Sequence, residues 1–301
     1  MLIAIKVLNS PNIKVEGMPM KILGLVGSYR KLGNTEVLVK EALMEAKRLG
    51  AEVDVLRLTD LKIEPCKGCM ACVFKQEECR IQDDWSYLRD MLEKSDGVVL
   101  GAPTYILGPP GIIKMIIDRN IAVMYQRDPS KIKPGAIIGV AGIKGWEPFT
   151  LPILNLFMLS LGFKVVDQAI FYAQGPGEIL LNDSAIERAR KIGFNLYQVA
   201  GQPSEKWNYF GEPGQCPNCH QNLFIIKNGN VECALCQTRA EIKIADGAIR
   251  LAFNPENLNE HRWSDKALQE NLFSAVLSSG PRFLEEKPEI EKKARKYLNL
   301  K

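Results

Sequence analysis

Short apolar runs alternate with amphipathic segments from residue 20 to about residue 200, and this alternation constrains the fold most strongly. Five runs have the character of buried strands, at 21–27, 52–58, 97–101, 136–141 and 164–169. Helical patterns fill most of the intervals and the end, at 36–49, 85–94, 111–125, 149–161 and 182–200. This alternation predicts a doubly wound α/β domain with five parallel strands in the order 2-1-3-4-5.

The loop after the first strand carries the side chains of an anion site. In such a sheet, the loops at the carboxyl ends of the strands form the ligand crevice. Hydroxyl, guanidinium and amide donors gather here with a flexible glycine, just before a helix N-terminus, at Ser28, Arg30, Gly33, Asn34 and Thr35. We therefore expect a phosphate site. The loop does not end in the Gly-Lys-Ser/Thr of a Walker A motif, and it lacks the Gly-x-Gly-x-x-Gly of dinucleotide-binding folds. The alternative is an ordinary strand-to-helix turn capped by Asn34 or Thr35.

The loop after the third strand is stiff, because prolines restrict it. It contains Pro103, Thr104, Tyr105 and Ile106. Preset backbone groups and a stacking Tyr105 would suit a flat heterocycle, and the fourth loop, beginning at Gly142, would cover the other side of the ring. The alternative is a loop shaped only for packing.

Eight cysteines fall into two sets of four, with none left over. The first cysteine set, spaced Cys-x2-Cys-x2-Cys-x6-Cys, is Cys66, Cys69, Cys72 and Cys79. Three close cysteines and one outlier are more typical of iron–sulfur ligation than of zinc, so this set predicts a [4Fe–4S] cluster. A zinc site or free thiols are the alternatives. Because its loop follows the second strand, topology places this set at the ligand edge.

The second cysteine set consists of two Cys-x2-Cys pairs separated by thirteen residues: Cys216, Cys219, Cys233 and Cys236. Hairpin signals lie between the pairs, around Asn228-Gly229, and after them, around Asp246-Gly247. This arrangement predicts a structural zinc ribbon with four ligands and no open position. Rubredoxin-like iron is the alternative. We expect His220 to be a surface side chain, and the ribbon to serve docking or oligomer contact.

Two helices are expected in the last segment, at 264–278 and 288–298, parted by Gly280-Pro281. Glutamates precede lysines and an arginine there, which favours a solvated, salt-bridged face. The divisions we expect are an N-terminal extension with one strand (1–19), the α/β domain (20–202, cysteine loop 59–83), the ribbon (203–253) and a helical tail (254–301).

Bulk composition is that of an ordinary globular protein, with 46% hydrophobic and 25% charged residues and a net charge of +4. That charge is too small to indicate nucleic-acid binding. No apolar run reaches the ~18 residues that span a bilayer, and residues 1–8 lack the features of a signal peptide. Paired Cys-x2-Cys spacings suit a reducing compartment, so we expect a cytoplasmic protein.

Three stretches together resemble the iron–sulfur flavoproteins, in the NAD(P)H-dependent FMN reductase branch of the flavodoxin-like superfamily. They are Gly-Ser-Tyr-Arg-Lys-Leu-Gly-Asn-Thr (27–35), the four-cysteine loop and Gly-Ala-Pro-Thr-Tyr…Asp-Arg (101–119). The resemblance implies FMN, with its phosphate at the first loop and its ring against Pro103, Thr104 and Tyr105. It also implies a [4Fe–4S] cluster and a homo-oligomer, a dimer or tetramer, that brings cluster and flavin together.

The expected function is FMN-dependent electron transfer coupled to the cluster, with a ferredoxin-like donor or NAD(P)H as the partner. No side chain is indicated as an obligatory acid or base. The alternative is an NAD(P)H-dependent FMN or quinone reductase without a cluster. A third hypothesis is a flavin-bound regulatory or nucleic-acid-binding protein that uses the ribbon.

Overall fold

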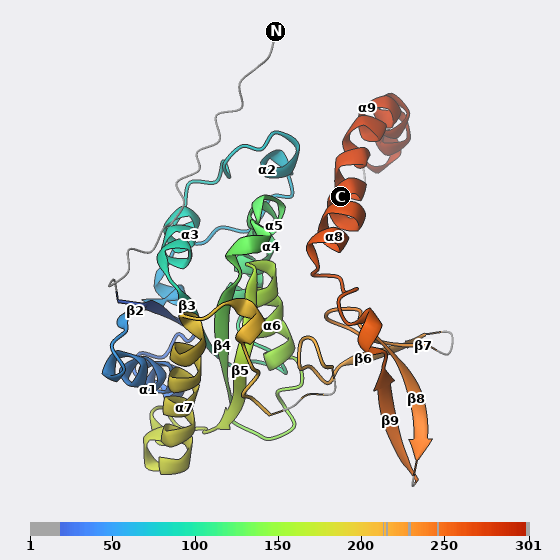
Figure 1. Cartoon of the computed structure of the whole chain (residues 1–301). Helices are drawn as coiled ribbons and strands as arrows, with labels where there is room; N and C mark the ends of the chain where they lie inside the picture. Colours follow the sequence, from blue (N-terminus) through green and yellow to red (C-terminus); the bar gives the residue numbers. More distant parts are fainter. Residues whose placement is uncertain (1–18, 213, 215, 228–229, 246, 299–301) are drawn as a thin grey trace.

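The computed structural model describes residues 19–298 except 213, 215, 228–229 and 246 (Figure 1). The strand expected near the N-terminus lies outside these residues. No helix in the described part of the chain is both long and apolar enough to cross a bilayer.

A five-stranded parallel sheet forms the centre of the α/β domain, and its order β2-β1-β3-β4-β5 confirms the prediction. The strands are β1 (Lys21–Val26), β2 (Glu52–Arg57), β3 (Gly97–Pro103), β4 (Lys133–Ala141) and β5 (Phe163–Tyr172). Val26 pairs with both Arg57 and Gly101. The carboxyl ends of neighbouring strands therefore align at one edge, called the carboxyl edge below.

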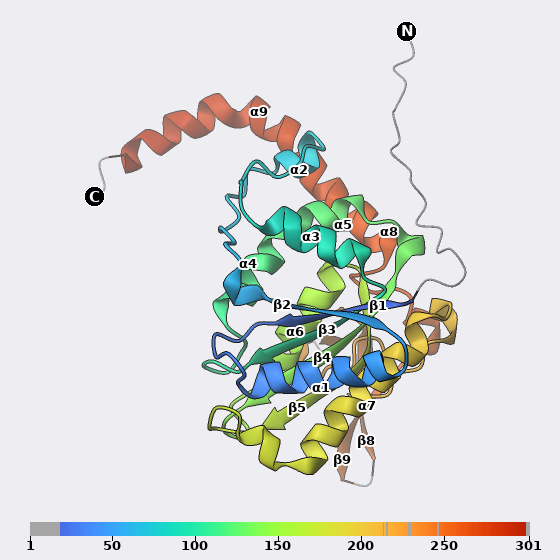
Figure 2. The same cartoon turned by 90° about the vertical axis from the view of Figure 1, so that its left-hand side faces the viewer.

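Helices cover both faces of this sheet (Figure 2). On one face lie α1 (Asn34–Arg48) and α7 (Asp183–Ala200), whose apolar side chains share one core with the sheet. On the other lie α3 (Trp85–Lys94), α4 (Gly111–Arg119) and α6 (Thr150–Ser160), which share a second core. Burial on both faces explains why the central strands are continuous apolar runs and not alternating patterns.

The single helix expected at 111–125 is wrong, because the structure has α4 followed by a separate α5 (Ile121–Gln126). The break falls at Asn120, which is fully buried. Its amide donates a hydrogen bond to the hydroxyl of Ser160 at 2.7 Å. A buried amide needs such a partner, and the helical pattern of the sequence does not show that this position contacts α6.

The second cysteine set belongs to a small antiparallel sheet in the order β6-β7-β8-β9. Its strands are β6 (Phe224–Lys227), β7 (Asn230–Cys233), β8 (Arg239–Ala245) and β9 (Ala248–Phe253). Both predicted hairpins are present, and β7 pairs with β8 to join them. This sheet is anchored to β5 by hydrogen bonds from the amide of Gln168 to the carbonyl of His220 (3.0 Å) and from Gln221 to Gln168 (3.1 Å).

The tail differs from the two helices expected. Short α8 (Asp265–Ala267) and a π-helical stretch (Leu268–Phe273) lead into α9 (Ser274–Ala294), which continues through Pro281 and Pro288. An interior proline removes one hydrogen bond and bends a helix, but need not end it. Gly280 suits a close approach, since a Cβ there would lie 2.9 Å from the ring of Phe74.

A third core joins the ribbon, the tail and the loop of the first cysteine set. It contains all four ribbon cysteines, Val73 from that loop, and Trp263, Leu268 and Phe273 from the tail. The loop's own short helix, α2 (Ala71–Phe74), packs against α5 and α9. Short 3-10 turns complete the structure at Leu58–Asp60, Pro129–Lys131, Glu178–Leu181, Ser204–Lys206, Pro255–Asn257 and Arg295–Tyr297.

Candidate functional site

The N-terminus of α1 lies at the carboxyl edge and offers an anion site. Gly33 precedes the helix in an extended conformation, and no side chain caps the helix. The first backbone N–H groups of such a helix lack partners within it and attract anions. Ser28 and Thr35 are buried beside this turn, and Arg30 is exposed. The donor set therefore fits a phosphate group.

The side chain of Asn34, at the first turn of α1, connects the anion loop to the loop after β5. Its amide nitrogen donates to the carbonyl of Gly175 at 2.8 Å, and its oxygen accepts from the N–H of Ile179 at 3.1 Å. Arg30 also reaches this segment, donating to the carbonyl of Gln174 at 3.4 Å. Sequence reasoning missed the loop after β5, although Gly175-Pro-Gly follows the strand after two residues and signals a turn at the same edge.

A buried ion cluster behind the anion loop was also missed. Glu36 contacts Lys40 at 2.6 Å and pairs with Arg57. Arg57 in turn donates to the carbonyl of Ser28 at 3.1 Å, so it holds the anion loop against the end of β2. Burial alone would raise the pKa of Glu36, but hydrogen bonds from Lys40 and the N–H of Leu32 outweigh it, so that the pKa is lowered.

We therefore expect Glu36→Gln to destabilise the protein by about 1–3 kcal/mol at neutral pH, because charge-assisted hydrogen bonds are lost. A lowered carboxyl pKa contributes stability above the unfolded pKa of about 4.3, and that contribution disappears as the pH falls through the folded pKa. Urea unfolding of both proteins between pH 7 and pH 3 measures this. The two curves should converge at the acid end; a constant difference would contradict the assignment.

The loop after β3 is held in a strained turn at the carboxyl edge. Tyr105 and Gly108 exchange backbone hydrogen bonds of 2.6 and 3.3 Å. Between them, Ile106 and Leu107 have φ values of +40° and +67°. Positive φ is costly for a branched side chain and is found mostly where function requires it. The turn leaves the Ile106 side chain 89% exposed.

The loop after β4 meets this turn, since the N–H of Phe149 donates to the carbonyl of Leu107 at 3.0 Å. Within it, one carboxylate oxygen of Glu147 accepts from the hydroxyl of Tyr172 at 2.8 Å. Burial and this hydrogen bond raise the pKa of Tyr172 to about 12. The other oxygen of Glu147 is buried without a hydrogen-bond partner. Such an acceptor at a ligand edge fits a ligand that carries an N–H or O–H donor.

Large apolar side chains stand exposed around the carboxyl edge: Tyr29, Leu32, Tyr105, Ile106, Trp146 and Leu181. They come from the loops after β1, β3, β4 and β5. An apolar rim with a phosphate site at one end and an unpaired acceptor nearby suits a flat, partly polar ring system. These residues therefore fit FMN.

The first cysteine set lies away from the carboxyl edge of its own chain, so that expectation is wrong. Cys79 contacts Arg119, the last residue of α4, a helix that begins at the edge with Gly111 and is about 13 Å long. Met70 and Cys72 belong to the third core, together with residues of α5 and α9. The loop is long enough to carry the cysteines across the helical face, as Figure 2 shows for α2.

Arg119 anchors both ends of the cysteine loop. Its side chain is 1% exposed, and that of its partner Asp83 is 0% exposed. The guanidinium donates to Asp83 at 2.7 Å, to the carbonyl of Glu64 at 2.9 Å and to the sulfur of Cys79 at 3.3 Å. Burial works against ionisation of Asp83, but hydrogen bonds from Arg119 and backbone N–H groups lower its pKa. Sequence reasoning gave Arg119 no separate role.

The thiols of the first set are close enough to influence one another. Burial raises the pKa of Cys72, and the neighbouring charges of Cys69, Cys79 and Cys66 raise it further. Cys66 and Cys69 are exposed, whereas Cys72 and Cys79 are half-buried. The four sulfurs do not gather around one point as the second set does. In a cubane cluster each thiolate binds a different iron, so a wider spacing fits that group.

The second cysteine set has the geometry of a closed site for a single metal ion. All four sulfurs are buried and lie within 4.8 Å of one another, with two pairs at 3.4 Å. Tetrahedral zinc at about 2.3 Å from each sulfur would place the sulfurs about 3.8 Å apart. His220 is not a free surface side chain as expected, because its ring stacks on Tyr209 at 3.5 Å and burial lowers its pKa to about 4.

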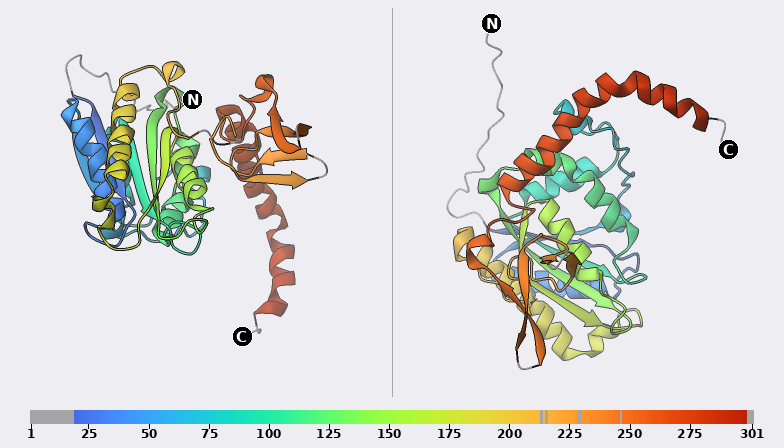
Figure 3. Two further views of the ribbon diagram at one scale, coloured as in Figure 1. Left: turned by 90° about the horizontal axis from the view of Figure 1, so that it is seen from below. Right: turned by 90° about the vertical axis from the view of Figure 1, so that its right-hand side faces the viewer.

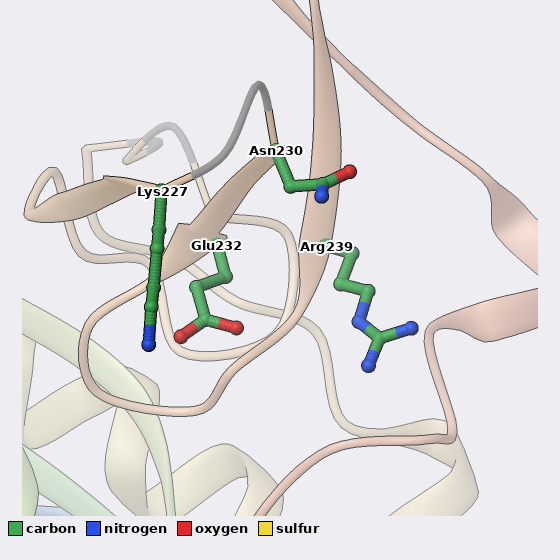
Figure 4. A pocket seen from close by; sticks show the side chains of 4 residues that line it. All are labelled: Lys227, Asn230, Glu232 and Arg239. Atoms are coloured by element: carbon green, nitrogen blue, oxygen red, sulfur yellow. The ribbon is translucent and has the colours of Figure 1, made fainter.

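A hollow on the ribbon is lined by four polar residues (Figure 4): Lys227, Asn230, Glu232 and Arg239. The carboxylate of Glu232 shares this face with the two cationic side chains. Its mixed charge differs from the dense basic face expected of a nucleic-acid surface.

Some known proteins match only the α/β domain of this chain, and others match most of its length. The sequence profile of the NADPH-dependent FMN reductase family matches residues 20–176. An iron–sulfur flavoprotein of Methanocaldococcus jannaschii is 31% identical over 189 residues, which are 60% of this chain and 97% of that protein. This match corresponds in extent to the α/β domain.

Longer matches extend beyond that domain. A flavone synthase of Aspergillus candidus is 30% identical over 259 residues, which are 75% of this chain and 79% of the relative. The solved structure of a flavone reductase superposes with a TM-score of 0.75 at 27% identity. It covers 94% of this chain and 99% of its own, so the shared architecture includes most of the ribbon and tail.

Proposed function

Because the chain belongs to the NADPH-dependent FMN reductase family and is an FMN-dependent oxidoreductase, we propose that it transfers electrons between FMN and a [4Fe–4S] cluster. FMN would lie at the carboxyl edge, and the first cysteine set would hold the cluster. When bound, FMN exchanges two electrons, singly or as a hydride, and a cluster exchanges one.

The residues at the carboxyl edge divide into those that bind FMN and those that position the binders. Ser28, Arg30, Thr35 and the N-terminus of α1 bind the phosphate, while Asn34 holds the loop after β5 in place. The ring lies against 103–106, with Gly142 on its other side. The unpaired oxygen of Glu147 is available to accept a hydrogen bond from the ligand.

Replacing Ile106 with glycine tests the ring position. The exposed Ile106 side chain would be covered by the flavin, and burying such a side chain is worth about 1.5–3 kcal/mol. We expect Ile106→Gly to weaken FMN binding about tenfold or more, while thermal stability of the FMN-free protein holds or rises because the positive φ suits glycine. Fluorescence titration and thermal melts measure the two effects. An unchanged affinity for FMN would show that the flavin ring does not contact this turn.

The contact between Arg119 and Cys79 carries the cluster assignment. A buried guanidinium that already pairs with Asp83 also donates to the sulfur of Cys79 at 3.3 Å, and this contact fixes the sulfur in place. Cysteine sulfurs that bind a metal commonly accept such hydrogen bonds. Since the cysteines and the carboxyl edge are apart within one chain, we infer a homo-oligomer in which the cluster of one copy approaches the flavin of another.

Metal and sulfide analysis of anaerobically purified protein tests this function. We expect about four iron and four sulfide per chain besides the zinc of the ribbon. Cys72→Ser should remove the iron and keep the zinc, whereas Cys216→Ser should remove the zinc. A yellow, iron-free wild-type protein would instead indicate the alternative, an NAD(P)H-dependent FMN or quinone reductase without a cluster.

The match to a flavone reductase over 94% of the chain favours a second candidate function, the reduction of an organic substrate. Tyr105, Ile106 and Trp146 of the apolar rim are exposed, and such side chains suit contact with a flat aromatic substrate. We infer reduction of a flavone-like conjugated double bond, with NAD(P)H supplying the hydride and water the proton. We expect anaerobic incubation with flavone and either NADPH or NADH to consume one nucleotide for each flavone reduced. Absence of a flavanone product would exclude this substrate.

We also propose an electron donor, a cytoplasmic location and a structural role for zinc. NAD(P)H or a ferredoxin-like protein supplies electrons. The eight cysteines form no disulfide, and half of them are fully buried, which suits the reducing cytoplasm. We assign zinc a structural role in the ribbon, where four thiolates leave no position for substrate.

A further inference from the structure

The two cysteine sets share one apolar core, although most of the α/β domain separates them in the sequence. All four cysteines of the second set are buried in the third core. Cys72 of the first set packs against the same core, and the next residue, Val73, is buried in it with 1% exposure. The metal site of the ribbon therefore borders the apolar packing that surrounds Cys72.

Helix α2, which carries Cys72 and Val73, depends on its neighbours. It has only four residues, and isolated helices shorter than about 12 residues are marginal in water. No side chain caps it, and Met70 at its N-cap has a φ of +55°, which is costly for a residue other than glycine. Because α2 packs against α5 and α9, these two helices maintain its conformation.

The tail contacts both of the elements involved, α2 and α5. Gly280 of α9 lies so close to α2 that an added Cβ would be 2.9 Å from the ring of Phe74. Phe273, just before α9, is fully buried, and its ring meets that of Tyr125 in α5 edge-on with the centroids 4.9 Å apart. Figures 1 and 3 show how the tail joins the ribbon and then leads along α9 away from the sheet. The start of the tail is thus the part that supports α2.

The second Cys-x2-Cys pair of the ribbon holds the tail at its other end. The N–H of Arg262 donates to the carbonyl of Cys236 at 2.8 Å. The indole N–H of the buried Trp263 donates to the carbonyl of Leu235, within the same pair, at 3.0 Å. A bound ion fixes the backbone of such a pair, because both sulfurs must face one centre. The metal therefore also fixes the position from which the tail starts.

We propose that the ribbon and the tail form a metal-dependent clamp, in which zinc bound by the second cysteine set keeps α2 folded and Cys72 in position to bind its own metal. Two binding sites that require the same folded core are coupled, so zinc should strengthen metal binding at the first set, and the reverse. The clamp rests on the function proposed above only in taking the first set as a metal site. It gives the ribbon a task beyond its own stability.

Alkylation of cysteines in the iron-free, full-length protein tests the clamp without any cluster. Zinc-loaded protein is compared with protein stripped of zinc by a chelator, and mass spectrometry identifies each modified cysteine. Removing zinc should speed modification of the half-buried Cys72 about tenfold or more, because α2 opens. Cys66 is already exposed and precedes α2, so its rate should change little and serves as the internal control. Adding zinc back should restore the slow rate.

Phe273→Ala tests whether the tail transmits the effect. Phenylalanine binds no metal, so the variant should keep its zinc. Because truncation removes packing from the third core, Cys72 should be alkylated about tenfold faster or more even with zinc bound. Phe253→Ala, in β9 of the ribbon and outside the third core, is the matched control and should leave this rate unchanged. Resistance of the α/β domain to proteolysis verifies that both variants are folded.

Zinc removal and Phe273→Ala act on the same contacts, so together they should speed alkylation no more than zinc removal alone. In protein that holds a cluster, Phe273→Ala should also release iron to a chelator about tenfold faster or more. A Cys72 rate that is equal with and without zinc, or a wild-type rate in zinc-loaded Phe273→Ala, would overturn the clamp. Iron-free wild-type protein would contradict the function proposed above, whereas the alkylation rates would still decide between a clamp and an independent ribbon.

Discussion

Arg119→Met should lower the free energy of unfolding by about 3–5 kcal/mol, because it leaves the carboxylate of Asp83 buried without its counter-charge. The melting temperature should fall by about 6 °C or more. The variant should also lose iron from the first cysteine set, since the guanidinium holds Glu64 and Cys79 at the two ends of that loop. Thermal unfolding followed by circular dichroism and iron analysis measure both effects.

Two further variants separate charge from packing. Arg119→Met/Asp83→Asn should recover part of the lost stability, because asparagine carries no unpaired charge and its single amide oxygen can still accept from the N–H group of either Glu64 or Trp85. Arg80→Met is the matched control. Arg80 adjoins Cys79 and forms an exposed pair with Glu77, so its loss should leave the free energy of unfolding nearly unchanged. An Arg119→Met variant as stable as Arg80→Met would contradict the role of the buried pair.

Removing the metal from the second cysteine set should unfold the ribbon. Structural zinc supplies about 10–16 kcal/mol of apparent binding free energy in small zinc domains, and most of it is folding free energy. The third core would lose its four cysteines, so Trp263 and Phe273 of the tail should become exposed as well. After treatment with a strong chelator, limited proteolysis should cut between residues 212 and 273.

The α/β domain should resist that proteolysis, because its two cores contain no cysteine of the second set. Cys216→Ser should reproduce the result without chelator. Ser279→Ala, in the exposed tail and outside the third core, is the control and should leave the cleavage pattern unchanged. A ribbon that stays protected after complete loss of zinc would show that packing alone maintains it.

Sequence patterns predicted the sheet well because the signal is local and repeated. Each central strand is buried on both faces, so the run at 97–101 is apolar throughout, and a crossover helix follows it. The elements that were predicted wrongly depend on distant contacts. Asn120, at the helix break, contacts the distant hydroxyl of Ser160, and α9, which continues through Pro281, begins beside Phe273 in the third core.

The candidate site divides in the same way. Residue types and loop positions indicated an anion loop at Ser28 and Arg30, and spacing indicated two metal sets. Arg57 and Glu36 join through the fold across 21 residues, and Arg119 reaches Cys79 across 40. Such pairs leave no periodic trace in one sequence. Topology also predicted correctly that the cysteine loop begins at the carboxyl edge. Because the loop is long, however, its thiols lie away from that edge, beside the helices.

An anaerobic reductive titration tests the central claim most directly, by counting the electrons that each chain accepts. Protein with one FMN and one cluster per chain should take up about three electrons, two at the flavin and one at the cluster. The Cys72→Ser variant should take up about two. Uptake of only two electrons by the wild-type protein, with no paramagnetic signal from reduced iron–sulfur centres, would contradict the account.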